Sequence, residues 1–105
     1  MKKYRNYEES LKARLVDAAY AREYLAIALE EYEEDGDCVA FLLAVRYVTE
    51  AQGGVSKLAE RIQMNRQSLY KVLSENGNPQ LNTICTILNG LGFKLSIDPL
   101  ESSPQ

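Results

Sequence analysis

The sequence contains no histidine, so it lacks the side chain that most often serves as a metal ligand and as a general base near neutral pH. Its two cysteines, Cys38 and Cys85, lie among apolar neighbours without the spacing of a metal site. We expect them to be reduced thiols in or near a core rather than a redox pair. A glycine-rich phosphate loop and a Ser-His-Asp arrangement are also missing. These absences predict a protein that is not an enzyme and that binds no metal or cofactor.

Long hydrophobic runs are missing as well. No stretch approaches the roughly 18 apolar residues that a transmembrane helix requires. Residues 1–7, which read MKKYRNY, lack the apolar run of a signal peptide. We therefore expect a soluble, cytoplasmic protein without membrane contact.

The charge is distributed unevenly along the 105 residues. Residues 1–36 carry six Lys and Arg against nine Asp and Glu, a balance of −3, whereas residues 55–95 carry five against two, a balance of +3. The second region is thus the basic part of an acidic protein, which is where a nucleic-acid binder concentrates its positive charge. A charge of +3 is too small for purely electrostatic binding, and a dimer would double it.

The region Val55–Leu73 is predicted to form two short helices joined by a tight turn. Ser56 is placed to cap the first helix and Asn65 to cap the second. The expected apolar positions are Leu58, Ala59, Ile62, Leu69, Val72 and Leu73. The expected exposed positions of the second helix can all hydrogen-bond a base edge or a phosphate, and they are Arg66, Gln67, Ser68, Tyr70, Lys71 and Ser74. This layout is typical of a DNA-binding helix-turn-helix, although a pair of amphipathic helices in any small α-helical protein would share the pattern.

Upstream, a heptad-like hydrophobic stripe begins after Glu8 and runs for about six turns. It predicts either one long helix with a bend or two helices, the second capped by Asp17. The stripe consists of Leu11, Leu15, Ala18, Leu25, Leu29 and Tyr32. It would pack on the core of this chain or, in part, on another chain. The acidic run from Glu30 to Asp35 lies at the end of this helix, where negative charges oppose the helix dipole. It would form either a solvated face or a surface for a basic partner.

Two further helices and a strand are expected downstream. Asp37 caps a helix that Gly53-Gly54 stops, and Asn82 caps a last helix after the Asn76–Pro79 turn. Residues 93–97 alternate between apolar and polar side chains, which predicts a strand. Because the chain offers no second strand, this segment would pair with its equivalent in a second copy, or else lie as an extended tail. The predicted dimer interface is Phe93, Leu95 and Ile97.

Several short segments carry a family resemblance. They are Gly53-Gly54, SKLAER at 56–61, NRQSLYK at 65–71, Leu73-Ser74 and GNP at 77–79. From Tyr24 to Ile97 the sequence resembles the Xre/Cro-like helix-turn-helix proteins known as addiction-module antidotes, and it is similar to HigA-like antitoxins. One departure is Gln63, which stands at the turn position usually held by glycine. A positive φ there would cost on the order of 1 kcal/mol relative to glycine.

The resemblance implies an all-α, λ-repressor-like helix-turn-helix domain at residues 37–97. It would follow an N-terminal helical extension, 1–36, end in a short C-terminal β-strand, and precede a flexible tail, 98–105. The implied function is that of an antitoxin in a type II toxin–antitoxin module. Such a protein binds operator DNA as a homodimer, represses its own operon and neutralises a RelE/ParE-like toxin by direct binding, which we place on the N-terminal helices. The alternatives are a stand-alone, Cro-like phage repressor without a toxin, and a protein-interaction module without DNA binding.

The resemblance also assigns roles to single residues. Those expected to face the groove are Arg66, Gln67, Ser68 and Tyr70. Those expected to reach phosphates are Lys71, Ser74 and Asn78, while Ser56 and Lys57 would meet the DNA backbone at a helix N-terminus. Together with Asn65, these residues form the predicted DNA-binding set.

Overall fold

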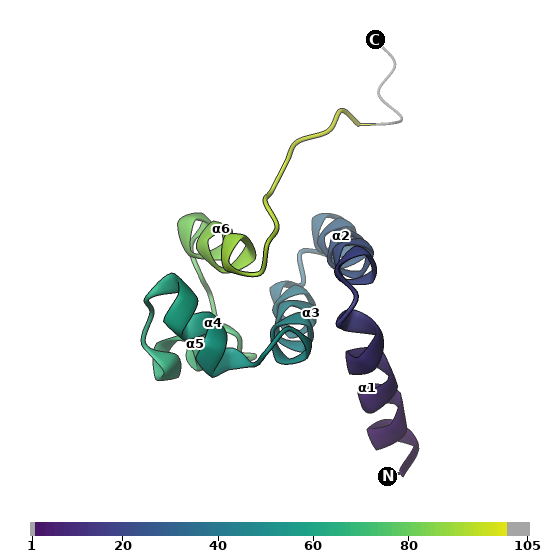
Figure 1. Ribbon diagram of the computed structural model, residues 1–105. Coiled ribbons are helices and arrows are strands. Elements are labelled where there is room, and N and C mark those ends of the chain that lie inside the picture. Colours follow the sequence, from purple (N-terminus) through teal and green to yellow (C-terminus); the bar gives the residue numbers. More distant parts are fainter. Residues whose placement is uncertain (1, 101–105) are drawn as a thin grey trace.

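The computed structural model describes the backbone of residues 2–100 and the side chains of residues 7–100, and this part of the chain contains six α-helices and no strand (Figure 1). The helices are α1 (Lys2–Leu15), α2 (Ala18–Asp35), α3 (Cys38–Ala51), α4 (Val55–Ile62), α5 (Arg66–Val72) and α6 (Leu81–Gly90). The all-α prediction is therefore confirmed for these residues. None of their helices is long and apolar enough to cross a membrane. The last five residues of the predicted tail lie outside the described part.

The N-terminal stripe forms two helices rather than one, with the corner at Asp17. The Asp17 side chain accepts a hydrogen bond of 2.9 Å from the amide of Ala19, as an N-cap does. The first helix begins at Lys2, earlier than the expected start at Glu8. Leu11 and Leu15 of α1 and Leu25 of α2 are buried in the same hydrophobic core as the residues of α3, so this part of the stripe packs on its own chain, whereas Ala18 and Tyr32 are exposed.

Helix α3 is the central element, and Figure 1 shows it between the α1–α2 pair and the group formed by α4, α5 and α6. Asp37 caps it by accepting hydrogen bonds from the amides of Val39 and Ala40, at 3.1 and 3.3 Å, as predicted. Its buried residues are Phe41, Leu42, Ala44, Val45, Val48 and Thr49. The Thr49 hydroxyl, the one polar group among them, donates to the Val45 carbonyl at 2.8 Å, so its burial leaves no unsatisfied donor.

The end of α3 is tied to the corner between α1 and α2. The Gln52 side-chain amide donates to the backbone carbonyls of Leu15, at 2.8 Å, and Val16, at 3.2 Å. These carbonyls lie at the C-terminal end of α1, where helix carbonyls have no hydrogen-bond partner within the helix. One side chain therefore joins the N-terminal helices to the residue that precedes the turn into α4.

Two predicted helix caps are wrong. Helix α4 begins at Val55 with Gly54 as its N-cap, so Ser56 lies inside the first turn and makes no capping bond. Helix α6 begins at Leu81 with Gln80 as its N-cap, so Asn82 is likewise inside the helix. In each case backbone geometry sets the start, because Gly54 has a φ of 99° and Pro79 has the fixed φ of its ring.

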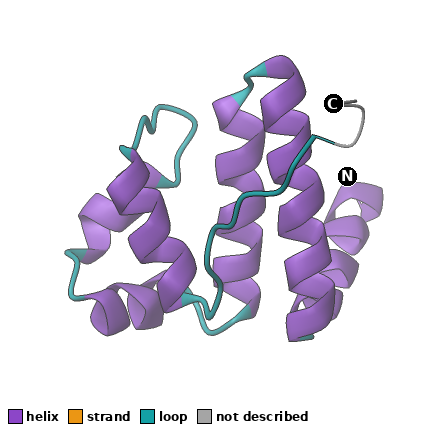
Figure 2. Ribbon diagram, turned by 90° about the horizontal axis from the view of Figure 1, so that it is seen from above, coloured by secondary structure: helices purple, strands orange, loops and turns teal. Residues whose placement is uncertain are grey.

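The predicted C-terminal strand is absent, and Figure 2 shows the segment after α6 as a loop. The amide of Phe93 still donates to the carbonyl of Leu88 at 2.8 Å, but residues 94–100 form no backbone–backbone hydrogen bond within the described chain. Phe93 and Leu95 pack against the core, whereas Ile97 is 97% exposed. The alternating pattern gives an extended chain, and a strand does not follow because no neighbouring strand supplies the second half of a ladder.

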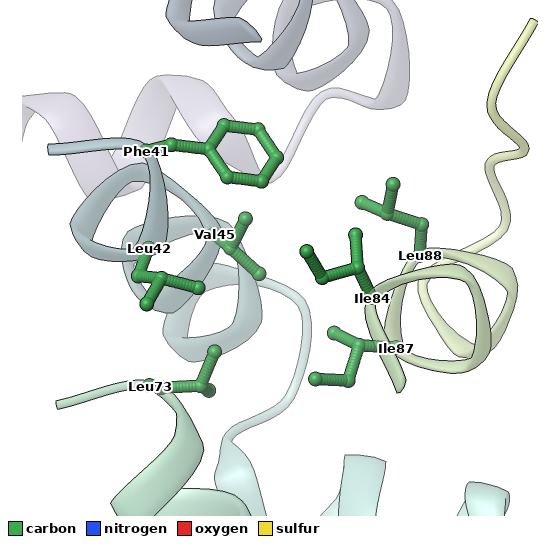
Figure 3. Close-up of a pocket in the computed structure, with 7 residues that line it drawn as sticks. All are labelled: Phe41, Leu42, Val45, Leu73, Ile84, Ile87 and Leu88. Atoms are coloured by element: carbon green, nitrogen blue, oxygen red, sulfur yellow. The ribbon is translucent and has the colours of Figure 1, made fainter. Parts of the chain in front are cut away.

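A small gap lies in the core between α3 and α6. Figure 3 shows side chains of both helices and Leu73 pointing toward a common space. The lining residues are all hydrophobic: Phe41, Leu42, Val45, Leu73, Ile84, Ile87 and Leu88. Its volume of about 10 Å³ barely admits one water molecule, and its walls offer that water no polar partner. The gap is therefore an imperfection of core packing and not a ligand site.

Candidate nucleic-acid interface

The connection between α4 and α5 is a tight, left-handed turn at Gln63, whose φ and ψ are 57° and 47°. The amide of Met64 donates to the Ala59 carbonyl at 2.9 Å, and the amide of Gln63 donates to the Glu60 carbonyl at 3.3 Å. This pair of bonds is a Schellman motif, in which glycine is the usual left-handed residue. Gln63 thus adopts the left-handed conformation whose cost was considered from the sequence.

Asn65 then starts α5 as predicted. Its side-chain oxygen accepts hydrogen bonds from the amides of Gln67, at 2.8 Å, and Ser68, at 3.1 Å. These amides belong to the first turn, where no carbonyl of the helix can reach them. The oxygen of Asn65 therefore serves the helix itself, although the residue also belongs to the predicted DNA-binding set.

Helix α5 presents two different faces. Leu69 and the following Leu73 are buried at 0% and 2% exposure, which anchors the helix on the core. The exposed side chains are polar or amphipathic, and they are Arg66, Gln67, Ser68, Tyr70 and Lys71. Ser74 is half-buried, and its hydroxyl donates to the Lys71 carbonyl at 2.7 Å and accepts from the Asn76 amide at 3.3 Å. Ser74 thus closes the helix end.

Helix α4 contributes to the same surface. Ser56 and Lys57 of its first turn line one shallow hollow together with Arg66, the first residue of α5. Ala59, Glu60 and Met64 complete that hollow. The structure therefore brings together predicted site residues from both helices. Asn78, in the exposed loop between α5 and α6, does not line this hollow.

The positive charges of this region differ in how their side chains are held. The exposed Arg61 guanidinium donates to the backbone carbonyl of Gly90 at 2.6 Å, which fixes it at the C-terminus of α6. Lys57, Arg66 and Lys71 are the other exposed cations of α4 and α5. Glu60 is the carboxylate that lines the hollow beside Lys57 and Arg66, which leaves the hollow positive on balance.

One side chain of this surface was not identified from the sequence. Arg46 of α3 lies with its Cζ atom 6.0 Å from the ring centroid of Tyr70, on α5. Its position after a run of eight apolar residues in that helix was the only available signal, because the contact joins elements that are distant along the chain. Arg46 thus adds a third helix to the surface.

A comparison with known protein families identifies the family of this chain. The family model described as "Probable addiction module antidote protein" matches residues 9–99. The chain belongs to this family. Membership in the antidote family supports the role of antitoxin in a toxin–antitoxin pair and implies a toxin partner in general. The match reaches back into α1, so the antidote pattern includes the N-terminal helices as well as α4 and α5. Neither the comparison with curated proteins nor that with solved structures gave a significant match.

Proposed function

We propose that this antidote protein uses α4 and α5 as a helix-turn-helix of the Xre/Cro type to bind the operator of its own operon. The observation that carries the proposal is the division of α5 into a buried anchor, Leu69, and an exposed row of hydrogen-bonding side chains that begins at the Asn65 cap. Residues at the N-terminus of a recognition helix are those that reach base edges in the major groove. In this arrangement Arg66, as the first residue, is the side chain with the best reach.

The protein would bind as a homodimer and act by binding alone, without catalysis. Two copies double the small positive charge of the module and match the two half-sites of an operator. The exposed apolar residues of the C-terminal segment, above all Ile97, supply surface for such a contact next to Phe93 and Leu95. Repression of its own operon would follow from occupation of the operator.

The toxin, proposed to be a basic RelE/ParE-like protein, would bind the outer face of α2. Tyr20 and Ile27 lie two helical turns apart and are 38% and 52% exposed, on the side opposite the buried Leu25. Glu23, Glu30 and Glu34 fall on the same face by helical spacing. Two apolar anchors among carboxylates complement a basic protein surface in both hydrophobicity and charge.

The DNA-binding proposal is tested with the duplex that lies upstream of the protein's own reading frame, against a scrambled duplex of equal composition. Replacing Arg66 with alanine should cost about 1–3 kcal/mol on the first duplex and little on the second. Replacing Lys71 with alanine should weaken both and reduce the salt dependence by roughly one counterion. Arg22→Ala, which removes an exposed arginine of α2, is the matched control. Unchanged DNA binding by both α5 variants would refute the proposal.

The toxin-binding proposal needs point substitutions, because deleting the N-terminal helices would remove Leu11, Leu15 and Leu25 from the core. Ile27→Lys should reduce affinity for the toxin encoded beside this protein by roughly tenfold or more, measured on the purified pair by calorimetry. Leu81→Lys is the matched control, since Leu81 is an exposed aliphatic residue of α6. Equal toxin affinity for Ile27→Lys and the wild type would remove α2 from the interface.

A further inference from the structure

Two arginines from different helices share the ring of Tyr70. The Cζ atom of Arg66, on α5, lies 5.4 Å from the ring centroid, and that of Arg46, on α3, lies 6.0 Å from it. Both distances are within the range of a cation–π interaction, in which the face of the ring attracts the guanidinium. Tyr70 is 40% exposed, so the cluster is at the surface and open to a ligand.

The two arginines differ in how they are held. The Nε atom of Arg46 donates to a carboxylate oxygen of Glu50 at 3.2 Å, and the other oxygen of Glu50 lies 3.2 Å from Nζ of Lys12, on α1. Arg46 is thus fixed to the helical scaffold. Within residues 7–100, Arg66 has no ion-pair partner, and its guanidinium lies over the ring of Tyr70. The Tyr70 ring therefore connects the unpaired guanidinium of Arg66 to the fixed guanidinium of Arg46.

We infer that Tyr70 is a positioning residue, whose ring holds the guanidinium of Arg66 in the orientation needed to read a base of the operator. Arg46 fixes the ring from the side of α3. The inference rests on the proposed DNA binding and deepens it, because the role it gives to Tyr70 is to orient Arg66 and not to contact the DNA. A flexible arginine that is oriented before binding loses less freedom on binding, which favours the correct site over other sequences.

The charge of the cluster points to the same kind of ligand. Arg46 is paired with Glu50, whereas no carboxylate is bonded to Arg66 within the described residues, so the uncompensated cation beside the ring is Arg66. An anionic or strongly accepting partner would compensate that charge. The guanine edge offers two acceptors to one arginine, and the neighbouring phosphates carry the negative charge.

The direct alternative is that the Tyr70 hydroxyl itself contacts the DNA, and two substitutions separate the two roles. Tyr70→Phe keeps the ring and removes the hydroxyl, whereas Tyr70→Leu removes the ring. Specificity is measured as the ratio of affinities for the duplex upstream of the protein's own reading frame and for a scrambled duplex. We expect Tyr70→Phe to keep the wild-type ratio within about twofold and Tyr70→Leu to lower it by roughly two- to fivefold.

A double-mutant cycle with Arg66→Ala tests the connection between the two side chains. If Tyr70 acts through Arg66, adding Tyr70→Leu to Arg66→Ala should cause no further loss of specificity. Arg46→Gln should lower the ratio in the same direction as Tyr70→Leu and should also have no effect once Arg66 is alanine. Thermal unfolding of each variant identifies any loss that comes from folding.

The outcomes separate this inference from the proposal beneath it. A wild-type protein that does not prefer its own upstream duplex would overturn the proposed function and the inference together. A wild-type protein that prefers it, with Tyr70→Phe as defective as Tyr70→Leu, would overturn the inference alone. Losses from Tyr70→Leu and Arg66→Ala that add in full would also overturn the inference and leave the proposed function standing.

Discussion

The guanidinium of Arg61 donates a hydrogen bond of 2.6 Å to the backbone carbonyl of Gly90. This contact joins α4 to the last residue of α6, where carbonyls lack partners within the helix and the helix dipole is negative. The two helices approach closely at this point because residue 90 has no side chain. The Arg61 side chain of the basic region is therefore fixed by the fold, although its charge stays at the surface.

Replacing Gly90 with alanine should destabilise the protein. The new Cβ atom would collide with the side chains of Ile62 and Leu58, which line the facing surface of α4. We expect a loss of about 1–3 kcal/mol in the free energy of unfolding, offset in part by the better helix propensity of alanine. Urea denaturation checks this, with Asn89→Ala, on the exposed side of α6, as the control. If the Gly90→Ala protein is as stable as the control, the collision is relieved by a movement of α6 that does not lower the free energy of unfolding.

Gln63→Gly should stabilise the protein. The left-handed conformation of Gln63 is strained for a residue with a side chain, and glycine adopts it without that strain. The gain, on the order of 0.5–1 kcal/mol after the extra entropy of the unfolded glycine chain, should raise the melting temperature by a few degrees. Gln63→Val provides the contrast and should lower it, because a β-branched residue fits this conformation worst. A lower melting temperature for Gln63→Gly would contradict the strain argument.

Two substitutions at Asn65 should separate helix capping from DNA binding. Asn65→Ala loses both capping bonds and should cost about 1 kcal/mol in stability. Asn65→Asp keeps an accepting oxygen and suits the positive end of the helix dipole, so its stability should stay close to that of the wild type. Its new negative charge beside Arg66 should nevertheless weaken DNA binding at low salt. Wild-type DNA affinity in Asn65→Asp would place the duplex away from the start of α5.

The free energy of unfolding should decrease at alkaline pH, in part because Tyr24 ionises. Burial, followed by the nearby Tyr7, raises the pKa of Tyr24 above the ordinary tyrosine value of about 10. Because the folded state holds this proton more tightly, the contribution is fully present below pH 10 and is lost as the pH rises through the folded pKa. Tyr24→Phe should therefore lose less stability than the wild type between about pH 9.5 and 11, while the two curves run parallel near pH 7. Thermal unfolding followed by circular dichroism across this range measures the difference, and equal slopes above pH 10 would refute it.

Local signals in the sequence were sufficient for most of the helices and for the turn at the candidate site. Asp17, Asp37 and Asn65 cap their helices as predicted, since an N-cap is a contact between residues two or three positions apart. Gln63 was singled out through the family resemblance, because it stands where the resembling proteins usually have glycine. Where Gly54 or Pro79 sets the helix start instead, a side-chain rule placed the cap two residues too late.

Contacts between distant parts of the chain were not predictable in the same way. The alternation of residues 93–97 fits a strand and an extended loop equally well, and only a partner strand could decide between them. The stacking of Arg46 on Tyr70 depends on the packing of α5 beside α3, which no local pattern encodes. The composition of the exposed face of α5 was predictable, whereas the interactions that orient its side chains required the structure.

The hydrogen bonds from Gln52 to the backbone carbonyls of Leu15 and Val16 couple the two ends of the molecule mechanically. Leu15 also lies in the core that α1 shares with α3, so a substitution that loosens this corner should be felt at both proposed surfaces, the one for the toxin and the one for the operator. Substitutions on the exposed face of α2 leave the link intact. Toxin binding should therefore be adjustable there without disturbing α4 and α5.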